Sequence, residues 1–378
     1  MNLPKNLAAQ LQKRIENQSL RKLAEPNDLI DFSSNDYLGF SKNQKTFDIA
    51  HKFLIENKST QNGATGSRLI SGNHAFYGEL EPFLSKFHES ESALVFNSGY
   101  DANIGFFSSV LQRGDLILYD EFSHASIRDG ITMSNAKSYK FKHNDLEHLE
   151  EFLHKFQKTE NIYVVTESVF SMDGDTPDLI KMNELIKKHK AYFVVDEAHA
   201  VGVFGESGKG VIQELQLQDD VFARIITFGK AIGCHGAAIL GNSDLRQYLI
   251  NFSRSFIYTT GLPPHSLVTI ILSYIELIKG ESQNELRENI NFFKQELIRL
   301  ELKPLFIESN SSIHSFVISG NERVKKLASQ IQERGFEVKP ILSPTVSEGE
   351  ERIRFCLHSY NSKEEITNVL ETLRIFVK

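Results

Sequence analysis

Two short apolar runs in the middle of the chain constrain its fold more than any other feature. The run at 192–195 ends at Asp196, and the run at 224–228 is followed by Lys230. A glycine-rich loop and a short amphipathic stretch separate the two runs, so the pattern predicts a strand–crossover–strand unit of a parallel sheet. Ligands of open α/β sheets bind beyond the carboxyl ends of the strands. We therefore expect Asp196 and Lys230 to face one crevice.

A lysine and an aspartate in one crevice suit pyridoxal phosphate. The lysine amine forms a Schiff base with the aldehyde, and the aspartate keeps the pyridine nitrogen protonated, so that the ring remains an electron sink. The alternative interpretation is a solvated loop lysine and a helix-capping aspartate. Lys230 and Asp196 alone do not decide between these two interpretations.

Composition narrows the class of protein. The chain has 378 residues, enough for two domains or for one domain with an appendage. Its formal net charge is −7 and no stretch is strongly basic, which argues against nucleic acid or an anionic membrane as a partner. Cys234 and Cys356 form neither a metal-binding spacing nor a disulfide framework, and no run is apolar enough to span a membrane. We expect no metal and a location in the cytoplasm.

Three further apolar runs, at 93–96, 116–119 and 162–166, also read as strands. Gly99 and Tyr100 follow the first run and open a helix, where backbone N–H groups and the helix dipole favour an anion such as a phosphate. An ordinary Asn-Ser-Gly turn has a similar sequence. The other two runs are followed by polar side chains that we expect at the same edge of the sheet: His124, Glu167 and Ser171.

Six segments in unbroken order resemble the α-oxoamine synthase family, and together they extend over nearly the whole chain. These enzymes have the fold-type I pyridoxal-phosphate architecture and condense an amino acid with an acyl thioester. The segments are SNDYLGF, SHASIRDGI, TESVFSMDGD, DEAHAVGVFGESGKG, TFGKAIGCHGAAILG and YTTGLPP. The letters DEAH also name a helicase box, but the chain has no Walker A motif upstream and no basic face.

The resemblance implies an α/β fold with a mostly parallel sheet in a large domain and a smaller carboxyl-terminal α+β domain. We expect an amino-terminal helix and arm at 1–40, a large cofactor-binding domain at 41–270 and a small domain at 271–378. The rhythm of the sequence after residue 270 fits this division, because a long amphipathic helix is followed by short strands at 315–318 and 336–339.

The resemblance also implies a role for each residue near the cofactor. Lys230 binds the aldehyde, Asp196 pairs with the ring nitrogen, His124 stacks on the ring, and His199 reaches the phenolic oxygen. These four residues are the expected catalytic set. The remaining cofactor contacts implied by the resemblance are Gly99, Tyr100, Ser171, Thr227 and Thr260.

Substrate contacts are expected mainly in the carboxyl-terminal part. The segment 352–357 alternates, which places Arg352, Arg354 and Cys356 on one strand face and the apolar residues on the core face. An arginine fork suits the carboxylate of an amino acid, and the family motif aligns Arg354 with that role; a solvated strand face is the alternative. The resemblance adds Asn35 near the substrate carboxylate and Arg21 near the acyl chain.

The implied reaction is a decarboxylating condensation of an amino acid, L-alanine, with pimeloyl-CoA or a pimeloyl-carrier protein, in biotin synthesis. The resemblance further implies a homodimer in which Thr260, or else Thr259, reaches the phosphate of the neighbouring subunit. Glycine C-acetyltransferase is the closest alternative, since it shares the fold and every site residue. A transaminase or lyase of the same fold is more distant. A non-catalytic regulator would need a DNA-binding arm, which the first 40 residues are too short and too weakly basic to supply.

Overall fold

The computed structural model describes residues 3–21, 23, 25 and 27–377. The chain divides into two compact units. The large unit comprises residues 35–171 and 176–284, and the small unit comprises 1–34, 172–175 and 285–378. The domain boundaries after residues 40 and 270 stay a prediction. Residues 264–278 belong to the large unit because the helix that they form packs on two helices near the start of that unit.

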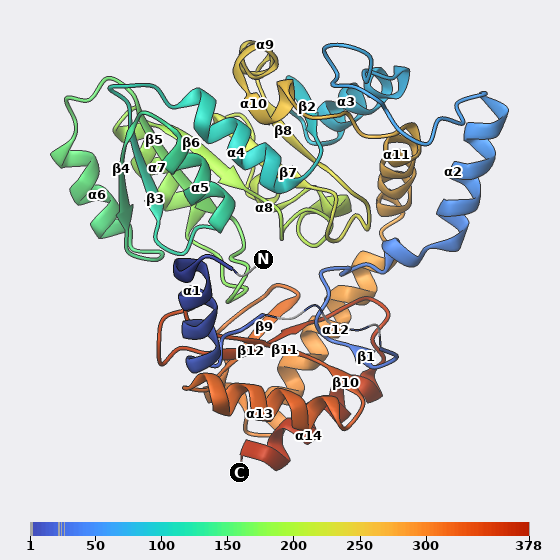
Figure 1. Cartoon of the computed structure of the whole chain (residues 1–378), viewed down its shortest axis with the longest axis vertical. Coiled ribbons are helices and arrows are strands. Elements are labelled where there is room, and N and C mark those ends of the chain that lie inside the picture. The colour runs from blue at the N-terminus through green and yellow to red at the C-terminus, as the bar shows by residue number, and fades with distance from the viewer. Residues whose placement is uncertain (1–2, 22, 24, 26, 378) are drawn as a thin grey trace. The chain divides into compact units, whose positions relative to one another are not determined.

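A seven-stranded sheet forms the centre of the large unit, with strand order β2-β8-β7-β6-β5-β3-β4 (Figure 1). Every strand runs in the same direction except β8, which is antiparallel to both of its neighbours. The expected mostly parallel sheet is confirmed. The strands are β2 (Ser92–Phe96), β3 (Leu116–Asp120), β4 (Lys137–Phe141), β5 (Ile162–Glu167), β6 (Tyr192–Asp196), β7 (Ala223–Thr227) and β8 (Ala237–Gly241).

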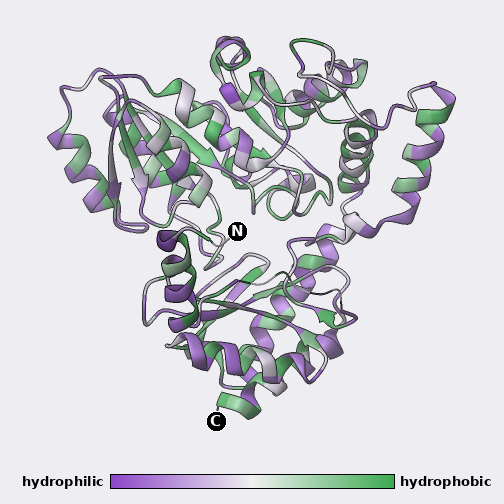
Figure 2. Ribbon diagram, viewed as in Figure 1, coloured by the Kyte–Doolittle hydropathy of each residue, from purple (hydrophilic) through white to green (hydrophobic). Residues whose placement is uncertain are grey.

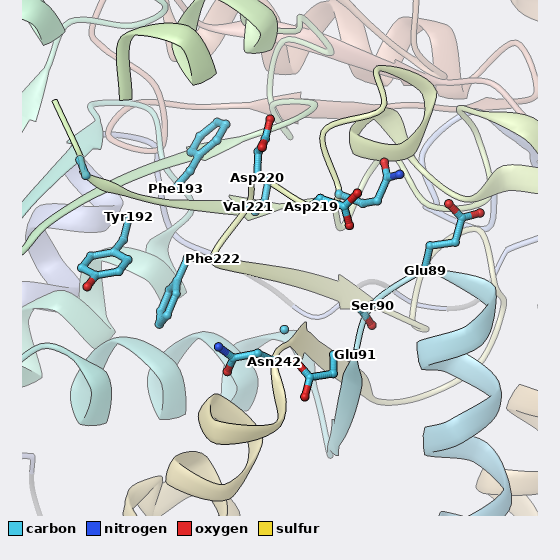
Figure 3. A pocket seen from close by; sticks show the side chains of 13 residues that line it. Glu89, Ser90, Glu91, Tyr192, Phe193, Asp219, Asp220, Val221, Phe222 and Asn242 are labelled. Atoms are coloured by element: carbon cyan, nitrogen blue, oxygen red, sulfur yellow. The ribbon is translucent and has the colours of Figure 1, made fainter. Parts of the chain in front are cut away.

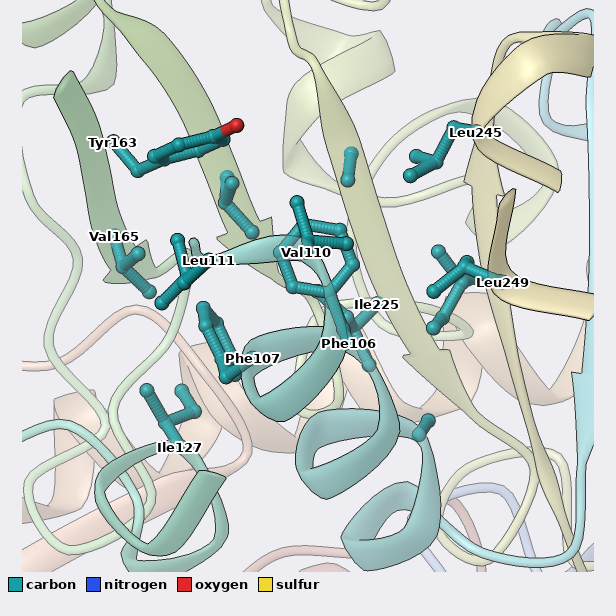
Figure 4. Close-up of a cluster of buried hydrophobic side chains, with 14 of the residues drawn as sticks. Phe106, Phe107, Val110, Leu111, Ile127, Tyr163, Val165, Ile225, Leu245 and Leu249 are labelled. Atoms are coloured by element: carbon teal, nitrogen blue, oxygen red, sulfur yellow. The ribbon is translucent and has the colours of Figure 1, made fainter. Parts of the chain in front are cut away.

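Helices cover both faces of this sheet because the central strands bury alternate side chains on opposite sides. One apolar cluster packs Tyr163, Val165 and Ile225 against the first group of helices, which contributes Phe106 and Phe107 (Figure 4). A second cluster on the other face contains Val164, Phe193 and side chains of the second group. The first group is α4 (Gly99–Val110), α5 (Ala125–Met133), α9 (Ser243–Phe252) and α10 (Arg254–Ile257). The second group is α6 (Leu146–Lys155), α7 (Leu179–Lys188) and α8 (Val211–Glu214).

The remaining helices of the large unit pack together near its edge. The long helix α11 contacts both α2 and α3. Hydropathy alternates along exposed helices such as α6, as Figure 2 shows, which is typical of a helix with one buried face. These elements are η1 (Phe40–Lys42), α2 (Gln44–Glu56), α3 (Ala75–Phe87), η2 (Glu206–Gly208) and α11 (Pro264–Ile278).

The small unit contains an antiparallel sheet of order β11-β12-β9 and a two-stranded parallel pair of β1 and β10. The last helix begins with a capping box, since Ser362 and Glu365 exchange side chain–backbone hydrogen bonds. Its elements are α1 (Lys5–Glu16), β1 (Ile30–Asp31), most of α12 (Glu281–Arg299), η3 (Lys303–Leu305), β9 (Ile313–Val317), α13 (Asn321–Gln332), β10 (Phe336–Glu337), β11 (Lys339–Ile341), β12 (Arg352–Cys356) and α14 (Lys363–Val377).

Strand β12 departs from the expected division into one core face and one substrate-facing face. Both faces are covered, because Cys356 and Arg352 are buried along with Ile353 and Phe355. Arg352 forms a buried ion pair with Asp173, which explains how a guanidinium is accommodated there. Arg354 is half-buried.

Helix α1 lies in the stretch 1–40, for which an amino-terminal helix and arm are expected. None of its residues is buried within the chain. Across the described part of the chain, no helix combines the length and the apolar character that a membrane span requires.

Candidate active site

The carboxyl ends of the parallel strands bring the candidate residues of the large unit to one edge of the sheet. Strand β5 ends at Glu167 and β6 ends at Asp196, and these two residues lie opposite each other on the paired strands. Lys230 follows β7 and His124 follows β3, which has the same direction. Both Asp196 and Lys230 act electrostatically on His124 and on Glu167, as groups that share one site do.

Asp196 is buried and held by two donors. The Ala198 backbone N–H donates to Oδ1 at 2.9 Å, and Nδ2 of Asn103 on α4 donates to Oδ2 at 2.9 Å. A carboxylate oxygen accepts more than one hydrogen bond. Asp196 therefore keeps acceptor capacity for a further cationic donor such as a protonated ring nitrogen.

The same Asn103 amide connects Asp196 to His124. Nδ2 of Asn103 also donates to Oγ of Ser126 at 3.0 Å, and Oγ of Ser126 lies 2.7 Å from Nδ1 of His124. His124 is the N-cap of α5, so the start of this helix orients its ring. A continuous hydrogen-bond network thus joins Asp196 to His124. Its central member, Asn103, was missed by sequence reasoning.

Lys230 lies beside a second network. Its Nζ atom is 2.6 Å from Nε2 of His199, and Nδ1 of His199 is 2.7 Å from the hydroxyl of Tyr37. Tyr37 donates to Oδ1 of Asn35 at 3.1 Å. Since the Tyr37 proton is directed to Asn35, the Tyr37 oxygen accepts from Nδ1–H of His199, and Nε2 is left as the acceptor towards Lys230. The fully buried Tyr37 is the second residue that sequence reasoning missed.

A short closed loop presents Lys230 after β7. The Phe228 N–H donates to the Gly236 carbonyl at 2.9 Å, and the Gly233 N–H donates to the Lys230 carbonyl at 2.8 Å. Gly233 has φ of 66°, and a Cβ atom there would lie 2.3 Å from the Ser41 backbone nitrogen. Only glycine fits this position, so the path of the loop is fixed by packing.

Glu167 binds the backbone of His124 at the start of α5. Its Oε1 accepts the His124 backbone N–H at 2.6 Å. Burial, reinforced by the negative charge of Asp196, holds the pKa of Glu167 well above its usual value, so the neutral acid is favoured. Burial likewise lowers the pKa of His124, against the opposing effect of Asp196, and favours the neutral imidazole.

The amino terminus of α4 offers an anion-binding position. Ser98 caps this helix by accepting the Asp101 N–H at 3.0 Å, and Gly99 and Tyr100 are its first residues. The first N–H groups of a helix have no partner inside the helix and suit a phosphate. A Cβ atom on Gly99 would lie 3.6 Å from Oγ1 of Thr227, so these two predicted phosphate contacts are neighbours. The hydroxyl of Tyr100 instead donates to Asp129 at 2.8 Å.

The turn that contains Thr259 and Thr260 lies beside the same helix start. Nδ2 of Asn97 donates to Oγ1 of Thr259 at 3.0 Å and to the Thr260 carbonyl at 2.5 Å. Thr260 is exposed, whereas the Thr259 hydroxyl is engaged within its own chain. Ser171 is half-buried on the loop after β5.

The two predicted arginines belong to the small unit. Nη2 of Arg354 donates to the Ser33 carbonyl at 3.5 Å, and Arg21 is exposed. Arg352, which the alternation places on the same strand face as Arg354, is instead engaged by Asp173. Burial and pairing leave Arg352 with a structural role within the small unit.

The fit to pyridoxal phosphate is good within the large unit. A lysine amine, a buried carboxylate with spare acceptor capacity, a histidine ring and a helix amino terminus with an adjacent hydroxyl match the aldehyde, ring nitrogen, ring face and phosphate in turn. Glu197, the second letter of DEAH, serves a different purpose. It forms a buried ion pair with Arg224, with Nε and Nη2 at 2.8 and 2.5 Å from Oε2.

A separate pocket of about 390 Å³ opens at the opposite edge of the sheet, and Figure 3 shows its lining. Tyr192 at the start of β6 and Phe222 just before β7 contribute to it, together with Asp219 and Asp220. The pocket therefore lies at the amino-terminal ends of the parallel strands, away from the edge that carries the candidate site.

Comparisons with known proteins agree with this arrangement. The model of the family described as aminotransferase class I and II matches residues 27–373. The chain therefore belongs to this family of fold-type I enzymes, which use pyridoxal phosphate.

Individual relatives narrow the class to the α-oxoamine synthases. The chain is similar to an 8-amino-7-oxononanoate synthase of Emericella nidulans, with 40% identity over 99% of this chain and 95% of that protein. A putative 8-amino-7-oxononanoate synthase of Methanococcus vannielii is 38% identical over 97% of each chain.

Solved structures give the same result. A serine palmitoyltransferase from S. paucimobilis superposes with a TM-score of 0.89 at 26% identity, covering 98% of this chain and 96% of that chain. An 8-amino-7-oxononanoate synthase from Francisella tularensis superposes with a TM-score of 0.79 at 28% identity, covering 93% and 98%.

Proposed function

We propose that this enzyme condenses L-alanine with a pimeloyl thioester, carried by coenzyme A or by a carrier protein, and produces 8-amino-7-oxononanoate for biotin synthesis. Two observations, taken together, support this proposal most strongly. Relatives at about 40% identity over nearly the whole chain bear that name, and Lys230 and Asp196 occupy adjacent strand ends in networks suited to pyridoxal phosphate.

The proposed overall reaction balances with one proton taken from the solvent. One carbon–carbon bond forms between the α-carbon of alanine and the acyl carbon. The acyl carbon–sulfur bond and the bond from the α-carbon to the carboxylate break, so a thiol and carbon dioxide leave. The α-carbon loses one proton before the condensation and regains one after decarboxylation, and the departing thiolate takes up one proton, so the net uptake from the solvent is one proton.

When bound, pyridoxal phosphate supplies the electron sink that stabilises negative charge on the α-carbon. In our proposal Lys230 holds the cofactor in the resting enzyme and then, as a free amine, takes the α-proton. His199, oriented by Tyr37 and Asn35, positions the amine. Asp196 holds the ring nitrogen in its protonated form.

The other residues of the site bind and orient. His124 covers one face of the ring, with Ser126 fixing its imidazole. Gly99, Tyr100, Ser171, Thr227 and, from the neighbouring subunit, Thr260 are the proposed cofactor contacts. Arg354 is the proposed partner of the alanine carboxylate, Asn35 is proposed as a second contact of that carboxylate, and Arg21 is proposed for the acyl chain.

A second candidate is an α-oxoamine synthase with another substrate pair. The structural similarity to serine palmitoyltransferase supports serine and a longer acyl thioester as an alternative substrate pair. Glycine C-acetyltransferase is a further alternative because it shares the proposed site residues.

One experiment distinguishes these candidates. The purified protein is incubated with alanine, glycine or serine and a panel of acyl-CoA thioesters that includes pimeloyl-CoA, and the products are identified by mass. We expect the highest kcat/KM for alanine with pimeloyl-CoA. A higher value for glycine with acetyl-CoA, or for serine with palmitoyl-CoA, would overturn the assignment.

A further inference from the structure

A cluster of ligand-type side chains lies on the large unit apart from the candidate active site. Glu150 and His154 are one helical turn apart on α6, and His189 caps the carboxyl end of the neighbouring α7. One potential ligand atom from each of the three lies within 4.8 Å of the others. The centroids of the two imidazole rings are 4.7 Å apart and the rings are nearly perpendicular. Nε2 of His154 is 3.5 Å from Oε1 of Glu150.

We propose that Glu150, His154 and His189 form a binding site for a divalent transition-metal ion of the zinc or nickel type. Two imidazole nitrogens and a carboxylate oxygen are a ligand set that such ions accept. Positions i and i+4 of a helix project from one face, so α6 presents two ligands together. Water would complete the coordination on the exposed side, since 57% of the His154 side chain is accessible to solvent.

The state of His189 supports this assignment. Its Nε2 atom is shielded from solvent and has no hydrogen-bond partner among the described residues. A shielded imidazole nitrogen without a partner is unfavourable unless another group satisfies it.

The ends of two helices favour positive charge at this point. His154 lies in the last turn of α6, and His189 is the C-cap of α7. The carboxyl end of each helix carries a partial negative charge from unpaired carbonyl groups. A cation between the two ends gains from both dipoles.

Lys188 is the resident cation of the cluster. Its Nζ donates to Oε1 of Glu150 at 2.7 Å. The Lys188 side chain is 60% exposed, so its ammonium can move into water when a metal takes its place. The proposal therefore has an asymmetric consequence: removal of an imidazole weakens metal binding, whereas removal of the Lys188 charge strengthens it.

Isothermal titration of the holoenzyme with zinc chloride tests the site. We expect one binding event that weakens by about tenfold or more in His154→Gln and in His189→Gln, and that tightens in Lys188→Gln. The exposed His51 on α2 provides a matched control, since His51→Gln should bind zinc as the unmodified enzyme does.

A second readout keeps the test independent of titration heats. Zinc should raise the thermal unfolding midpoint of the unmodified protein through mass action, and should raise it less in His154→Gln. Equal zinc affinity in the unmodified enzyme, His154→Gln and His189→Gln, or an equal shift of the midpoint, would overturn the proposal.

Discussion

The Nζ atom of Lys230 lies 2.6 Å from Nε2 of His199, and the opposite nitrogen of that imidazole is bound to the hydroxyl of Tyr37. The two residues come from the ends of adjacent strands, β7 and β6. A buried tyrosine therefore sets the orientation of the ring that contacts the lysine. The position of the amine depends on residues far from it in the sequence.

Replacing Lys230 with alanine should leave the fold intact and reduce turnover by at least about a thousandfold, because the covalent anchor and the proton acceptor are lost together. Borohydride reduction of the holoenzyme, followed by peptide mapping, should place the fixed cofactor on Lys230. Recovery of the label on a different lysine would remove the central assignment.

Replacing Asp196 with asparagine should reduce kcat by about a hundredfold or more, because the ring nitrogen loses its counter-charge. Asn103→Leu removes the amide that donates to Asp196 and to Ser126 but keeps the carboxylate, so a smaller loss of about tenfold is expected. The absorbance spectrum of the bound cofactor, titrated against pH, should shift in both variants. Wild-type kinetics and spectra in Asn103→Leu would show that the network is not used.

Substitution of Arg354 should affect substrate binding, whereas substitution of Arg352 should affect stability. Arg354→Lys keeps the charge but loses the fork, and should raise KM for the amino acid with little change for the acyl thioester. Arg352→Met leaves Asp173 buried without its partner, and should lower the free energy of unfolding by about 3 kcal/mol. Denaturant unfolding and two-substrate kinetics distinguish the effects, and a larger change of amino-acid KM in Arg352→Met would reverse the two roles.

Subunit mixing should reveal whether the threonines cross a dimer interface. Lys230→Ala is combined with the double variant Thr259→Ala/Thr260→Ala under conditions that exchange subunits. If the threonines serve the neighbouring subunit, one site of each heterodimer receives both defects and the other receives neither, so activity should return in part. Verified heterodimers without activity would place the threonines in the site of their own subunit or in no site.

His314 should make the small unit less stable at mildly acidic pH. This residue of β9 is buried against Phe293, and burial, with a smaller effect of Lys294, lowers its pKa to about 3. Between about pH 3 and the unfolded-state pKa near 6.5, the unfolded chain binds the extra proton, so stability falls as the pH falls.

His314→Leu removes that proton-binding difference. The free energy of unfolding of the variant, measured in urea between about pH 7 and pH 5, should decline less steeply than that of the unmodified protein, by about 1.4 kcal/mol per pH unit at most. Parallel slopes for the two proteins would show that His314 does not govern this pH dependence.

The sequence is informative where local pattern and topology coincide. Apolar runs that end in polar residues predict strands whose carboxyl ends share an edge, and this placed Asp196, His124 and Lys230 correctly along the sheet. Strand β8 was not predicted, because the small residues of AAILG give little β signal before a partner strand is known.

Residues that act through packing were harder to predict. Asn103 lies inside α4, where an asparagine is ordinarily unfavourable, and this misfit was the available signal for a buried hydrogen-bonding role. Tyr37 gave no such signal within SNDYLGF. The alternation around Arg352 predicted a strand correctly. The burial of Arg352 could not be inferred from the local pattern, because its partner Asp173 is far away in sequence.

The division of the chain into units has a consequence for synthesis on the ribosome. The large unit is complete once residue 284 has emerged, but the small unit combines residues 1–34 and 172–175 with the last part of the chain. We therefore expect the large unit to fold while translation continues. During that interval Asp173 lacks its ion-pair partner Arg352. The short 172–175 segment can therefore adopt its final structure only after the carboxyl-terminal strands have been synthesised.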